Sequence, residues 1–329
     1  MTGEEQNGSA KKCIIVIGHA ALDEVYRVAH LPTTPGKFRA FEHRTCGGGS
    51  AANAACAVAR LDGWAAFWGR TGDDLAGTRI RSSLVDCGVD VNALRAFNGA
   101  RTSQCAVVVD SCGERMVITE RDHAMPMKPD WLPIANVGQS HAVLSDLTWH
   151  EATVAAFSAA REHRVPTIID ADVASGLPSQ DILQLTDYAI FSQAALEQVF
   201  EGDTTSALLS HVCALRVPYA GVTLGAGGYQ WLRWNEHIAA QPAFEVEAID
   251  TTGAGDAFHG AFAWAVARGL DDRECARLAS AAAAMSCRAL GARTALPTVS
   301  ELDVFLRERT GSGFELRTQD GCRSAHQKP

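Results

Sequence analysis

Short apolar blocks alternate along the chain with longer segments of helical character. Residues 13–18 form an apolar block that ends in glycine, which is typical of a buried strand in a parallel sheet. The same pattern predicts strands within 65–74 and at 141–147, 166–172, 187–193 and 219–228. Helices are predicted at 50–61, 76–88, 150–163, 255–269 and 272–290. Because strands and helices alternate, we expect a parallel sheet covered on both faces.

Two segments have the pattern of antiparallel strands instead. Residues 37–45 and 102–120 alternate or pair their apolar positions, and Cys112 and Gly113 mark a turn that divides the second segment. These segments predict one small sheet added to the main body.

Composition and charge limit the class of protein. The 329 residues are 47% hydrophobic and 20% charged, as in an ordinary globular protein with a full core. A net charge of −9 and the lack of a basic run argue against a nucleic-acid partner. No apolar run reaches the roughly 20 residues that a membrane span requires.

The cysteines point to a reducing compartment. The ten cysteines include no C-x-x-C pair, which argues against structural zinc. A disulfide framework is also unexpected in a chain of this length without a signal peptide. We therefore expect a cytoplasmic protein. Residues 1–12 and 311–329 are polar and are expected to be flexible tails.

The most informative stretch is "DTTGAGDAFHG" at 250–260, where small residues precede a predicted helix. The first amides of a helix have no partner within it, and the helix dipole adds partial positive charge there. Gly253, Ala254 and Gly255 carry almost no side chain, so an anion can approach these amides closely. The stretch predicts an anion hole.

Asp256 follows this anion hole directly. A carboxylate there repels an anion, but it makes sense if it takes a proton from a nucleophile that attacks the anion. An alcohol that attacks a phosphoryl group needs both devices. The other interpretation, that Asp256 only stabilises the helix start by its charge, stays open on this residue alone. The P-loop pattern is absent, and a dinucleotide fingerprint fails because Phe258 occupies its third glycine position.

Three motifs, in this order, resemble the ribokinase-like (PfkB) carbohydrate kinases. They are "GGGSAANAACAVARLDGWAAFWGRTGDD" at 47–74, "VTLGAGG" at 222–228 and "DTTGAGDAFHG" at 250–260. The resemblance covers about residues 13–308. It implies an α/β fold, a three-layer sandwich with a central mostly parallel sheet and a small β-sheet lid. One kinase domain would span 13–310, with a discontinuous lid formed by about 24–46 and 97–124.

The resemblance implies an ATP-dependent kinase that phosphorylates a hydroxyl of a small sugar. Asp256 would be the catalytic base, and the amides of Gly253, Ala254 and Gly255 would stabilise the transferred phosphoryl group. The sugar would be bound by Asp23, Lys37, Gly48, Gly49 and Asn53. Structural roles are the rival interpretation: a loop cap for Asp23, an ordinary first-turn polar residue for Asn53, and a solvated surface lysine for Lys37.

In the nucleotide half, the resemblance implies that ATP is bound by Thr223, Gly225, Gly228, Gln193, Ala283 and Cys287. Tight helix packing explains Ala283 and Cys287 equally well. Mg²⁺ would bridge the phosphates. Many members order this ion with an N-x-x-E motif, whereas here Gln193 replaces the Asn, Leu196 replaces the Glu, and Glu197 lies one position later.

Two further expectations come from the resemblance. Asp250 and Thr252 resemble a loop that binds a monovalent cation in some members, so K⁺ is expected there. Family members often pair their lids, and the lid has exposed strand edges that a second copy can cover. A homodimer through the lid is therefore expected.

A finer resemblance, to the sulfofructose kinase branch, limits the choice of substrate. Three segments carry it: "LPTTPGKFRAFEHRTCGGGSAA" at 31–52, "SDLTWH" at 145–150 and "PAFEVEAIDTTGAGDAFHGA" at 242–261. The branch phosphorylates a ketose with an anionic sulfonate, 6-deoxy-6-sulfofructose, which Lys37 could pair with.

Two positions depart from this branch. Thr148 stands where an Arg is expected, and Thr119 where an Asn is expected. Arg121 and His123 lie nearby and could compensate, or the substrate is another ketose or sugar acid. A catalytically silent sugar- or nucleotide-sensing protein on the same fold is the alternative function, although such a protein would be expected to lose the base or the anion hole.

Overall fold

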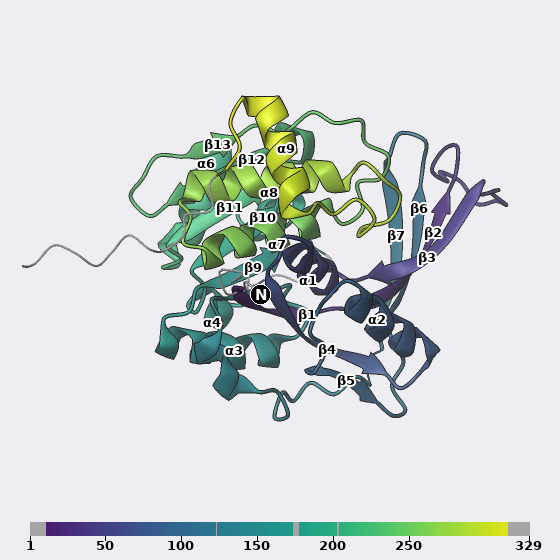
Figure 1. Cartoon of the computed structure of the whole chain (residues 1–329), viewed down its shortest axis with the longest axis horizontal. Helices are drawn as coiled ribbons and strands as arrows, with labels where there is room; N and C mark the ends of the chain where they lie inside the picture. The colour runs from purple at the N-terminus through teal and green to yellow at the C-terminus, as the bar shows by residue number, and fades with distance from the viewer. Residues whose placement is uncertain (1–10, 123, 174–177, 203, 315–329) are drawn as a thin grey trace, which may run out of the picture.

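The main body is built on a nine-stranded sheet (Figure 1), in the order β13-β12-β11-β10-β9-β8-β1-β4-β5. The computed structural model describes residues 11–122, 124–173, 178–202 and 204–314, so 1–10 and 315–329 of the predicted tails lie outside the described residues. The strands are β1 (Cys13–Gly18), β4 (Trp64–Gly72), β5 (Leu94–Phe97), β8 (Ala142–Ser145), β9 (Thr167–Ala171), β10 (Tyr188–Ser192), β11 (Tyr219–Thr223), β12 (Tyr229–Arg233) and β13 (Ala239–Gln241).

The sheet is mostly parallel, as the alternation of strands and helices predicts. Neighbouring strands from β5 to β11 are parallel, whereas β12 pairs antiparallel with both β11 and β13 at one edge. The short antiparallel strands follow the glycines of 225–228, where Leu224 N donates to Gly228 O and the chain turns back. The sequence pattern does not single out β5, β12 or β13, because these strands are short or lie at the edge.

Helices cover both faces of this sheet. Successive side chains of β1 point to opposite faces: Ile14 and Val16 join one buried cluster, and Ile15 and Ile17 join the other. The first face is covered by α1 (Ser50–Arg60), α2 (Leu75–Asp86), α7 (Ala254–Ala267), α8 (Asp272–Ser286) and α9 (Val299–Thr310). The second face is covered by α3 (His150–His163), α4 (Gln180–Leu183), α5 (Gln193–Val199) and α6 (Thr205–Ala214). The result is the predicted three-layer sandwich.

Small residues let α7 lie deep in the first layer. Every residue from Ala257 to Ala267 is buried, as expected for a helix that is apolar on all sides. Gly260 lies against α1, where an added Cβ would be 2.5 Å from Ala54 O. Packing on both sides therefore fixes the position of the first turn of α7.

The strand order reverses between β1 and β8. From β1 the chain builds outward through β4 and β5, and it then returns to β8 and builds through β9 to β11 in the other direction. In open α/β sheets, ligands bind beside the carboxyl ends of strands at such a reversal. His19 follows β1 and Asp146 follows β8 at this place.

A four-stranded sheet, in the order β3-β2-β6-β7, lies at one side of the body (Figure 1). Its strands are β2 (Ala21–Arg27), β3 (Glu42–Gly48), β6 (Gln104–Val109) and β7 (Arg115–Glu120). β6 and β7 form the predicted hairpin, in which Gly113 adopts a φ of 83°. Residues 37–41, expected as the start of a strand, lie instead in the connection before β3.

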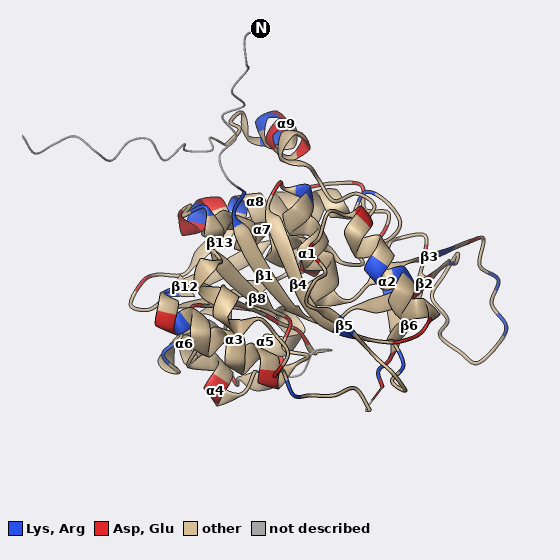
Figure 2. Cartoon of the chain, turned by 60° about the horizontal axis from the view of Figure 1, so that its bottom comes forward, with Lys and Arg blue, Asp and Glu red and all other residues tan. Residues whose placement is uncertain are grey.

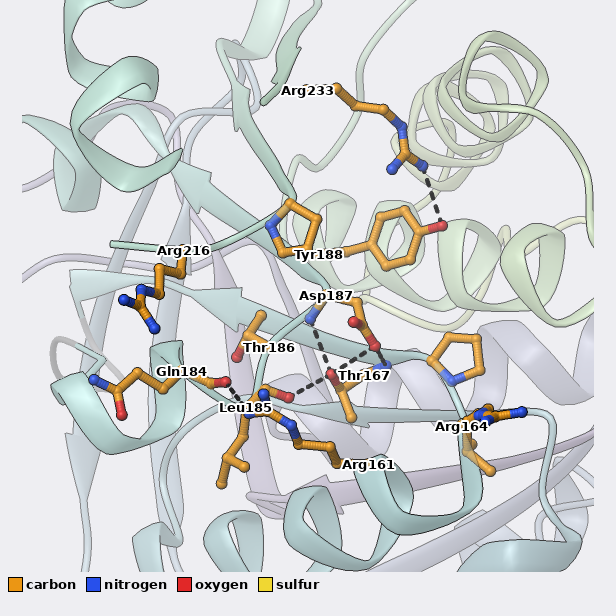
Figure 3. A pocket seen from close by; sticks show the side chains of 13 residues that line it. Arg161, Arg164, Thr167, Gln184, Leu185, Thr186, Asp187, Tyr188, Arg216 and Arg233 are labelled. Atoms are coloured by element: carbon orange, nitrogen blue, oxygen red, sulfur yellow. Dashed lines mark hydrogen bonds between the residues drawn. The ribbon is translucent and has the colours of Figure 1, made fainter. Parts of the chain in front are cut away.

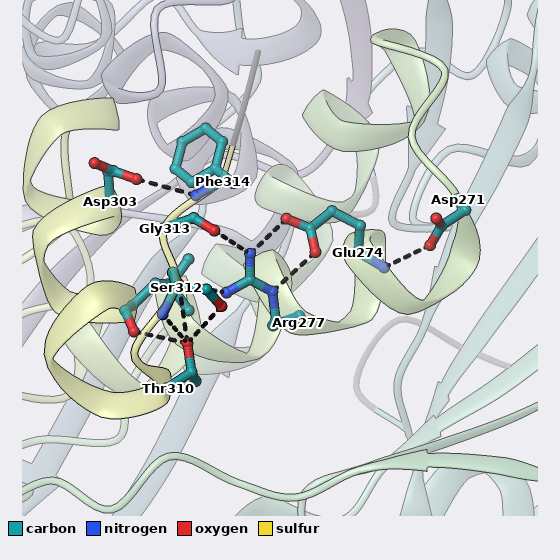
Figure 4. Close-up of polar contacts among 9 residues, drawn as sticks. Asp271, Glu274, Arg277, Asp303, Thr310, Ser312, Gly313 and Phe314 are labelled. Atoms are coloured by element: carbon teal, nitrogen blue, oxygen red, sulfur yellow. Dashed lines mark hydrogen bonds and ion pairs between the residues drawn. The ribbon is translucent and has the colours of Figure 1, made fainter. Parts of the chain in front are cut away.

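Polar contacts fix the last described residues to the body (Figure 4). Arg277 forms a salt bridge of 2.6 Å with Glu274 and donates to Gly313 O at 3.0 Å. The amide of Phe314 donates to Asp303 Oδ1 at 3.0 Å, which ties the chain back to α9. Figure 2 shows that charged residues of both signs lie on the outer helices. None of the helices in the described part of the chain has the length and apolar character of a membrane span.

Candidate active site

The predicted anion hole lies at the first turn of α7, where small residues leave the backbone bare. The helix begins after Gly253, whose φ is 77°, and no side chain caps its amides. A Cβ on Gly253 would lie 2.5 Å from the Cβ of Ala292, so this left-handed position requires glycine. Around Gly255 there is open space, because no atom beyond its own helix and chain neighbours lies within 4 Å of where its Cβ would be. An anion can therefore approach the helix start.

The three amides of this turn differ in availability. Ala254 N donates to Thr251 O at 3.2 Å and is thus engaged within the loop. For the amides of Gly253 and Gly255, no acceptor is found among the described residues. The prediction gave all three amides the same role, and the geometry leaves Gly253 and Gly255 as the freer pair.

Asp256 lies in the same turn and faces α1. Asn53 Nδ2 donates to Asp256 Oδ2 at 2.7 Å. Burial, together with the charge of Asp170, raises the pKa of Asp256 to about 7, against the effect of the Asn53 hydrogen bond. A carboxylate with a pKa near neutrality can accept a proton from a hydroxyl under physiological conditions. The geometry thus joins two residues that the sequence places 203 positions apart.

Arg293 organises this corner and was missed by the sequence analysis. Its Nε donates to Asn53 Oδ1 at 2.7 Å, and its Nη2 donates to Gly48 O at 3.0 Å. The side-chain amide of Asn53 therefore bridges Arg293 to Asp256 and has one available orientation. The only local signal is a lone arginine after Gly291 in "LGART", which no pattern of spacing connects to the rest of the site.

Asp23 lies inside β2 rather than in a loop after β1, so the loop-cap interpretation is wrong. Burial raises the pKa of Asp23 to about 6. Its Oδ1 is buried and has no hydrogen-bond partner among the described residues. A Cβ on Gly48 would overlap its carboxylate, which explains the glycine there. An unsatisfied buried acceptor is costly unless a ligand hydroxyl completes it.

Asp146 joins the two strands at the reversal of strand order. Its Oδ2 accepts the amides of His19 at 2.8 Å and Ala51 at 3.1 Å, and its Oδ1 accepts the Thr148 hydroxyl at 2.7 Å. Burial, with the charge of Arg121, lowers the pKa of His19 to about 4, so its ring is neutral. The sequence analysis did not single out Asp146, which fixes the start of α1 and hence Gly49 and Asn53.

The predicted nucleotide residues gather at the carboxyl ends of β10 and β11. Thr223 ends β11, and Gly225 and Gly228 follow it with φ angles of 56° and 89°. A Cβ on Gly228 would overlap Gln241 O, so the turn requires glycine. On α8, Ala283 is half-buried and Cys287 is buried. Cys287 O accepts the amides of Ile249 and Asp250, at 2.8 and 3.2 Å, which gives this residue a structural role in the loop before α7.

The departure from the N-x-x-E motif has a structural explanation. Leu196 is buried in the core of the second face, whereas Glu197 is exposed. Gln193 begins α5 directly after β10, and its Nε2 donates to Glu197 Oε1 at 2.8 Å. The carboxylate thus lies beside Gln193 in spite of the shift by one position. No cluster of three or more acidic, His or Cys side chains within the described ranges is arranged to hold a metal ion.

The loop before α7 has one feature that fits a monovalent cation. Thr252 Oγ1 is buried without a hydrogen-bond partner among the described residues. Asp250 is buried as well, and its two carboxylate oxygens accept the amides of Thr252 and Gly291, both at 2.8 Å. The loop is therefore ordered by Asp250, and the free hydroxyl offers an oxygen ligand.

The tip of the β6–β7 hairpin contacts this same loop. Arg115 Nη1 donates to Thr251 Oγ1 at 2.7 Å, and the Thr251 hydroxyl donates to Gly113 O at 3.1 Å. Lys37, in contrast, is exposed in the connection between β2 and β3, and no contact of its side chain is recorded among the described residues. The structure thus brings the tip of the β6–β7 hairpin to the loop before α7 but leaves Lys37 at the surface.

Known proteins are similar to this chain in fold and in sequence. The ribokinase of Arabidopsis thaliana, solved in complex with ribose and ATP, superposes with a TM-score of 0.79 at 26% identity, covering 91% of this chain and 99% of that chain. A fructokinase of Klebsiella pneumoniae is 34% identical over 281 residues, which covers 78% of this chain and 91% of the relative. The ATP-dependent ribose-1-phosphate kinase of Halopiger xanaduensis is 30% identical over 313 residues, covering 90% and 98%.

A three-layer body, a small antiparallel sheet and a helix start that combines bare amides with a carboxylate define a carbohydrate kinase of the ribokinase-like fold. The family model described as pfkB family carbohydrate kinase matches residues 11–299, nearly the whole described chain. The chain belongs to the PfkB family of carbohydrate kinases.

Proposed function

We propose that this kinase transfers the γ-phosphoryl group of ATP to a hydroxyl of a small ketose or sugar acid that carries an anionic group, with 6-deoxy-6-sulfofructose as the specific candidate. The observation that carries the kinase chemistry is the position of the Asp256 carboxylate in the same helix turn as the free amides of Gly253 and Gly255, where burial raises its pKa. A silent sensor has no use for this combination. The phosphoryl transfer is therefore the better of the two functions.

The proposed reaction uses these groups in order. Asp256 accepts the proton of the sugar hydroxyl as its oxygen attacks the γ-phosphorus of ATP. The bond from that phosphorus to the bridging oxygen breaks, and ADP leaves. The amides of Gly253 and Gly255 stabilise the negative charge on the phosphoryl oxygens during transfer. Asp23, through its unsatisfied Oδ1, and Asn53 orient the sugar.

Metal ions are assigned to two places in this proposal. Mg²⁺, when bound, neutralises the phosphates, and Gln193 and Glu197 are the residues proposed to order its water ligands. K⁺ is proposed for the loop of Asp250 and Thr252, with the free Thr252 hydroxyl as one ligand. Thr223, Gly225 and Gly228 are proposed to contact the nucleotide, and Ala283 to border its base.

The anionic substrate is supported by positive charge near the sugar end of the site. Arg121 follows β7, and its charge reaches His19, whose pKa it helps to lower. Arg121 is half-buried, and its charge also reaches Cys105, which pairs with Asp23 in the small sheet. The ribose-1-phosphate kinase of Halopiger xanaduensis acts, by its name, on an anionic sugar. Thr148 carries no charge and is engaged with Asp146, so Arg121 is the stronger candidate for the anion.

A homodimer through the lid is proposed from the surface of β7. This edge strand is exposed along its whole length and presents Met116, Val117 and Ile118, which are 39%, 46% and 64% exposed. Apolar edge strands are normally covered by another chain. Light scattering should give twice the mass of one chain, and Val117→Lys with Ile118→Lys should give a monomer.

The substrate is tested by measuring ATP consumption with a sugar panel. The panel contains sulfofructose, fructose, fructose phosphates, ribose, ketodeoxygluconate and nucleosides, and the Asp256→Asn variant is the blank for contaminating kinases. Sulfofructose or another anionic sugar should give the highest kcat/KM. Arg121→Ala should raise KM for that sugar and leave KM for fructose unchanged.

The outcomes separate the two parts of the proposal. Highest kcat/KM with neutral fructose or ribose would remove the anionic substrate and leave the kinase in place. ATP consumption that is equal in wild type and Asp256→Asn for every sugar would remove the phosphoryl-transfer mechanism as well.

A further inference from the structure

A polar pair is buried between the main sheet and the first turns of α7. Every residue of α7 from Ala257 to Ala267 is buried, and His259 is the one titratable side chain in that run. Asp170 lies on β9 under this helix and is 7% exposed. Its Oδ1 lies 3.5 Å from His259 Nδ1. Burial of two ionisable groups is costly, so this pair is unexpected in a layer that is otherwise apolar.

The register of the main sheet explains why Asp170 faces α7. Ile168, two positions earlier on β9, belongs to the buried cluster of the first face, and side chains two apart on a strand point to the same face. Asp170 also pairs with Ile190 of β10, which belongs to the same cluster. The Asp170 carboxyl therefore lies near the carboxyl end of β9, on the face of the sheet that α7 covers.

Two oxygens face the same ring nitrogen of His259. Besides the Asp170 carboxyl, the carbonyl oxygen of Gly255 lies 2.7 Å from His259 Nδ1. A carbonyl oxygen can only accept, so Nδ1 carries the proton and donates it to Gly255 O. Burial lowers the pKa of His259, so the ring is neutral, and Nε2 has no hydrogen-bond partner among the described residues. The ring is thus held in one tautomer through Nδ1.

The Gly255 carbonyl belongs to the peptide that joins Gly255 to Asp256. Glycine has the freest backbone of all residues, and the open space around Gly255 provides no packing contact that limits it. The hydrogen bond from His259 comes from the next turn of α7 and restrains this peptide plane. Rotation of the plane would change the direction in which the side chain of Asp256 leaves the helix. His259 therefore controls the orientation of the base from behind.

Asp170 and Asp256 also interact by charge. The other titratable groups that face Asp170, His259 and Asp256 are Asp146 after β8, Asp172 after β9 and Arg115 of the β6–β7 hairpin. Burial, with the charges of Asp172 and Asp146, raises the pKa of Asp170. After burial, the charge of Asp170 is the next cause that raises the pKa of Asp256. Two acids this close do not ionise independently.

We propose that His259 and Asp170 are positioning residues for the catalytic base. His259 fixes the peptide that carries Asp256, and Asp170 fixes the ring of His259 and places a second acid within electrostatic reach of the base. This inference rests on the phosphoryl transfer proposed above for Asp256.

A matched pair of variants isolates the hydrogen bond of His259. Val and Thr have the same shape, but only the Thr hydroxyl can donate to the carbonyl four residues earlier in a helix. His259→Thr and His259→Val leave the same space beside Asp170, so the loss of packing is equal in both. The kcat of His259→Thr should be about fivefold above that of His259→Val, since one hydrogen bond has an effect of that order. Steady-state assays should give equal KM values for ATP and for the best sugar, and melting curves should give similar Tm values.

Asp170→Asn tests the charge of the second acid. The variant keeps the shape of the side chain but no longer opposes ionisation of Asp256, so the midpoint of the pH profile of kcat/KM should fall by about one pH unit. Glu236→Gln, which removes one exposed charge from the turn between β12 and β13, should leave the midpoint unchanged. A role of Asp170 in packing alone would not move the midpoint.

The outcomes separate this inference from the proposed function. Equal kcat in His259→Thr and His259→Val would overturn the role of His259, and an unchanged midpoint in Asp170→Asn would overturn the role of Asp170. In both cases Asp256→Asn should still be inactive. Wild-type turnover in Asp256→Asn would overturn the phosphoryl-transfer mechanism and this inference together.

Discussion

The amino and carboxyl edges of the main sheet differ in the charged side chains that they present. At the amino edge, where β9, β10 and β11 begin, a pocket is lined by four arginines and one acid, Asp187 (Figure 3). At the carboxyl edge, Asp23, Asp146, Asp250 and Asp256 gather, although this is the edge proposed to receive ATP. Positive potential comes there from backbone amides at the start of α7 rather than from an arginine beside the phosphate.

This difference explains how a catalytic base, Asp256, can lie next to an anion-binding site. An arginine in contact with Asp256 would lower the pKa of that carboxyl and keep it ionised, which weakens it as a base. Bare amides attract a phosphoryl group and leave the pKa of Asp256 at about 7. Arg293 does not contact Asp256 directly, because the side chain of Asn53 lies between the guanidinium group and the Asp256 carboxylate. At the amino edge, where no such base is proposed, arginines line the pocket directly.

Removal of the base should have the largest effect. Asp256→Asn keeps the shape and the contact with Asn53 but cannot accept a proton, so kcat should fall by about 10³-fold. Steady-state assays with the best sugar of the panel measure this, and calorimetry should show ADP binding within a few-fold of wild type. Near-normal turnover would mean that the carboxyl edge does not need its acid for chemistry.

A side chain added at Gly253, in the bare start of α7, should have the second largest effect. Gly253→Ala places a methyl group against Ala292 in a left-handed position, which displaces the amides, so kcat should fall by about 100-fold. The double variant Gly253→Ala with Ala292→Gly relieves the contact but not the backbone strain, and only part of the activity should return. Full activity in Gly253→Ala would show that amide position is unimportant at this edge.

The pH profile follows from the raised pKa of Asp256. Because the base acts when deprotonated, kcat/KM should rise with pH through about 7, by about tenfold between pH 6 and pH 8. Measurements over this range with a sugar that does not titrate there give the midpoint. A midpoint near the usual Asp value of about 4 would contradict the separation of Asp256 from positive charge.

Arg293 should act through position rather than chemistry. Arg293→Met removes its hydrogen bonds to Asn53 and Gly48, so the KM for sugar should rise about fivefold, with kcat nearly unchanged. Arg293→Lys should restore part of this loss. A fall in kcat with KM constant would instead make the guanidinium part of the transition-state contacts.

Substitution of Glu197 should have the smallest effect on activity. Glu197→Gln keeps the size and the link to Gln193 but removes the charge, so the Mg²⁺ concentration for half-maximal rate should rise about threefold. Glu201→Gln, an exposed neighbour, is the control. If both variants behave as wild type, the shifted carboxylate has no part in ordering the ion.

Features that depend on neighbours in sequence could be predicted, whereas those that depend on folding could not. Strand and helix alternation, the turn at Gly113 and the bare start of α7 are local, and the fold agrees with them. Arg293 meets Asn53 across 240 positions, and no local pattern indicates that contact. The link between Gln193 and Glu197 depends on Leu196 turning into the core, which only the packed structure decides.

The hydroxyl of Thr251 connects two segments that lie far apart in the sequence. It holds the tip of the β6–β7 hairpin through Gly113 and Arg115, and it stands on the loop that delivers the backbone to α7. Separation of the hairpin from the body would break both hydrogen bonds. The backbone that leads into α7 is therefore expected to lose order whenever the hairpin does, although the two segments lie 138 positions apart in the sequence.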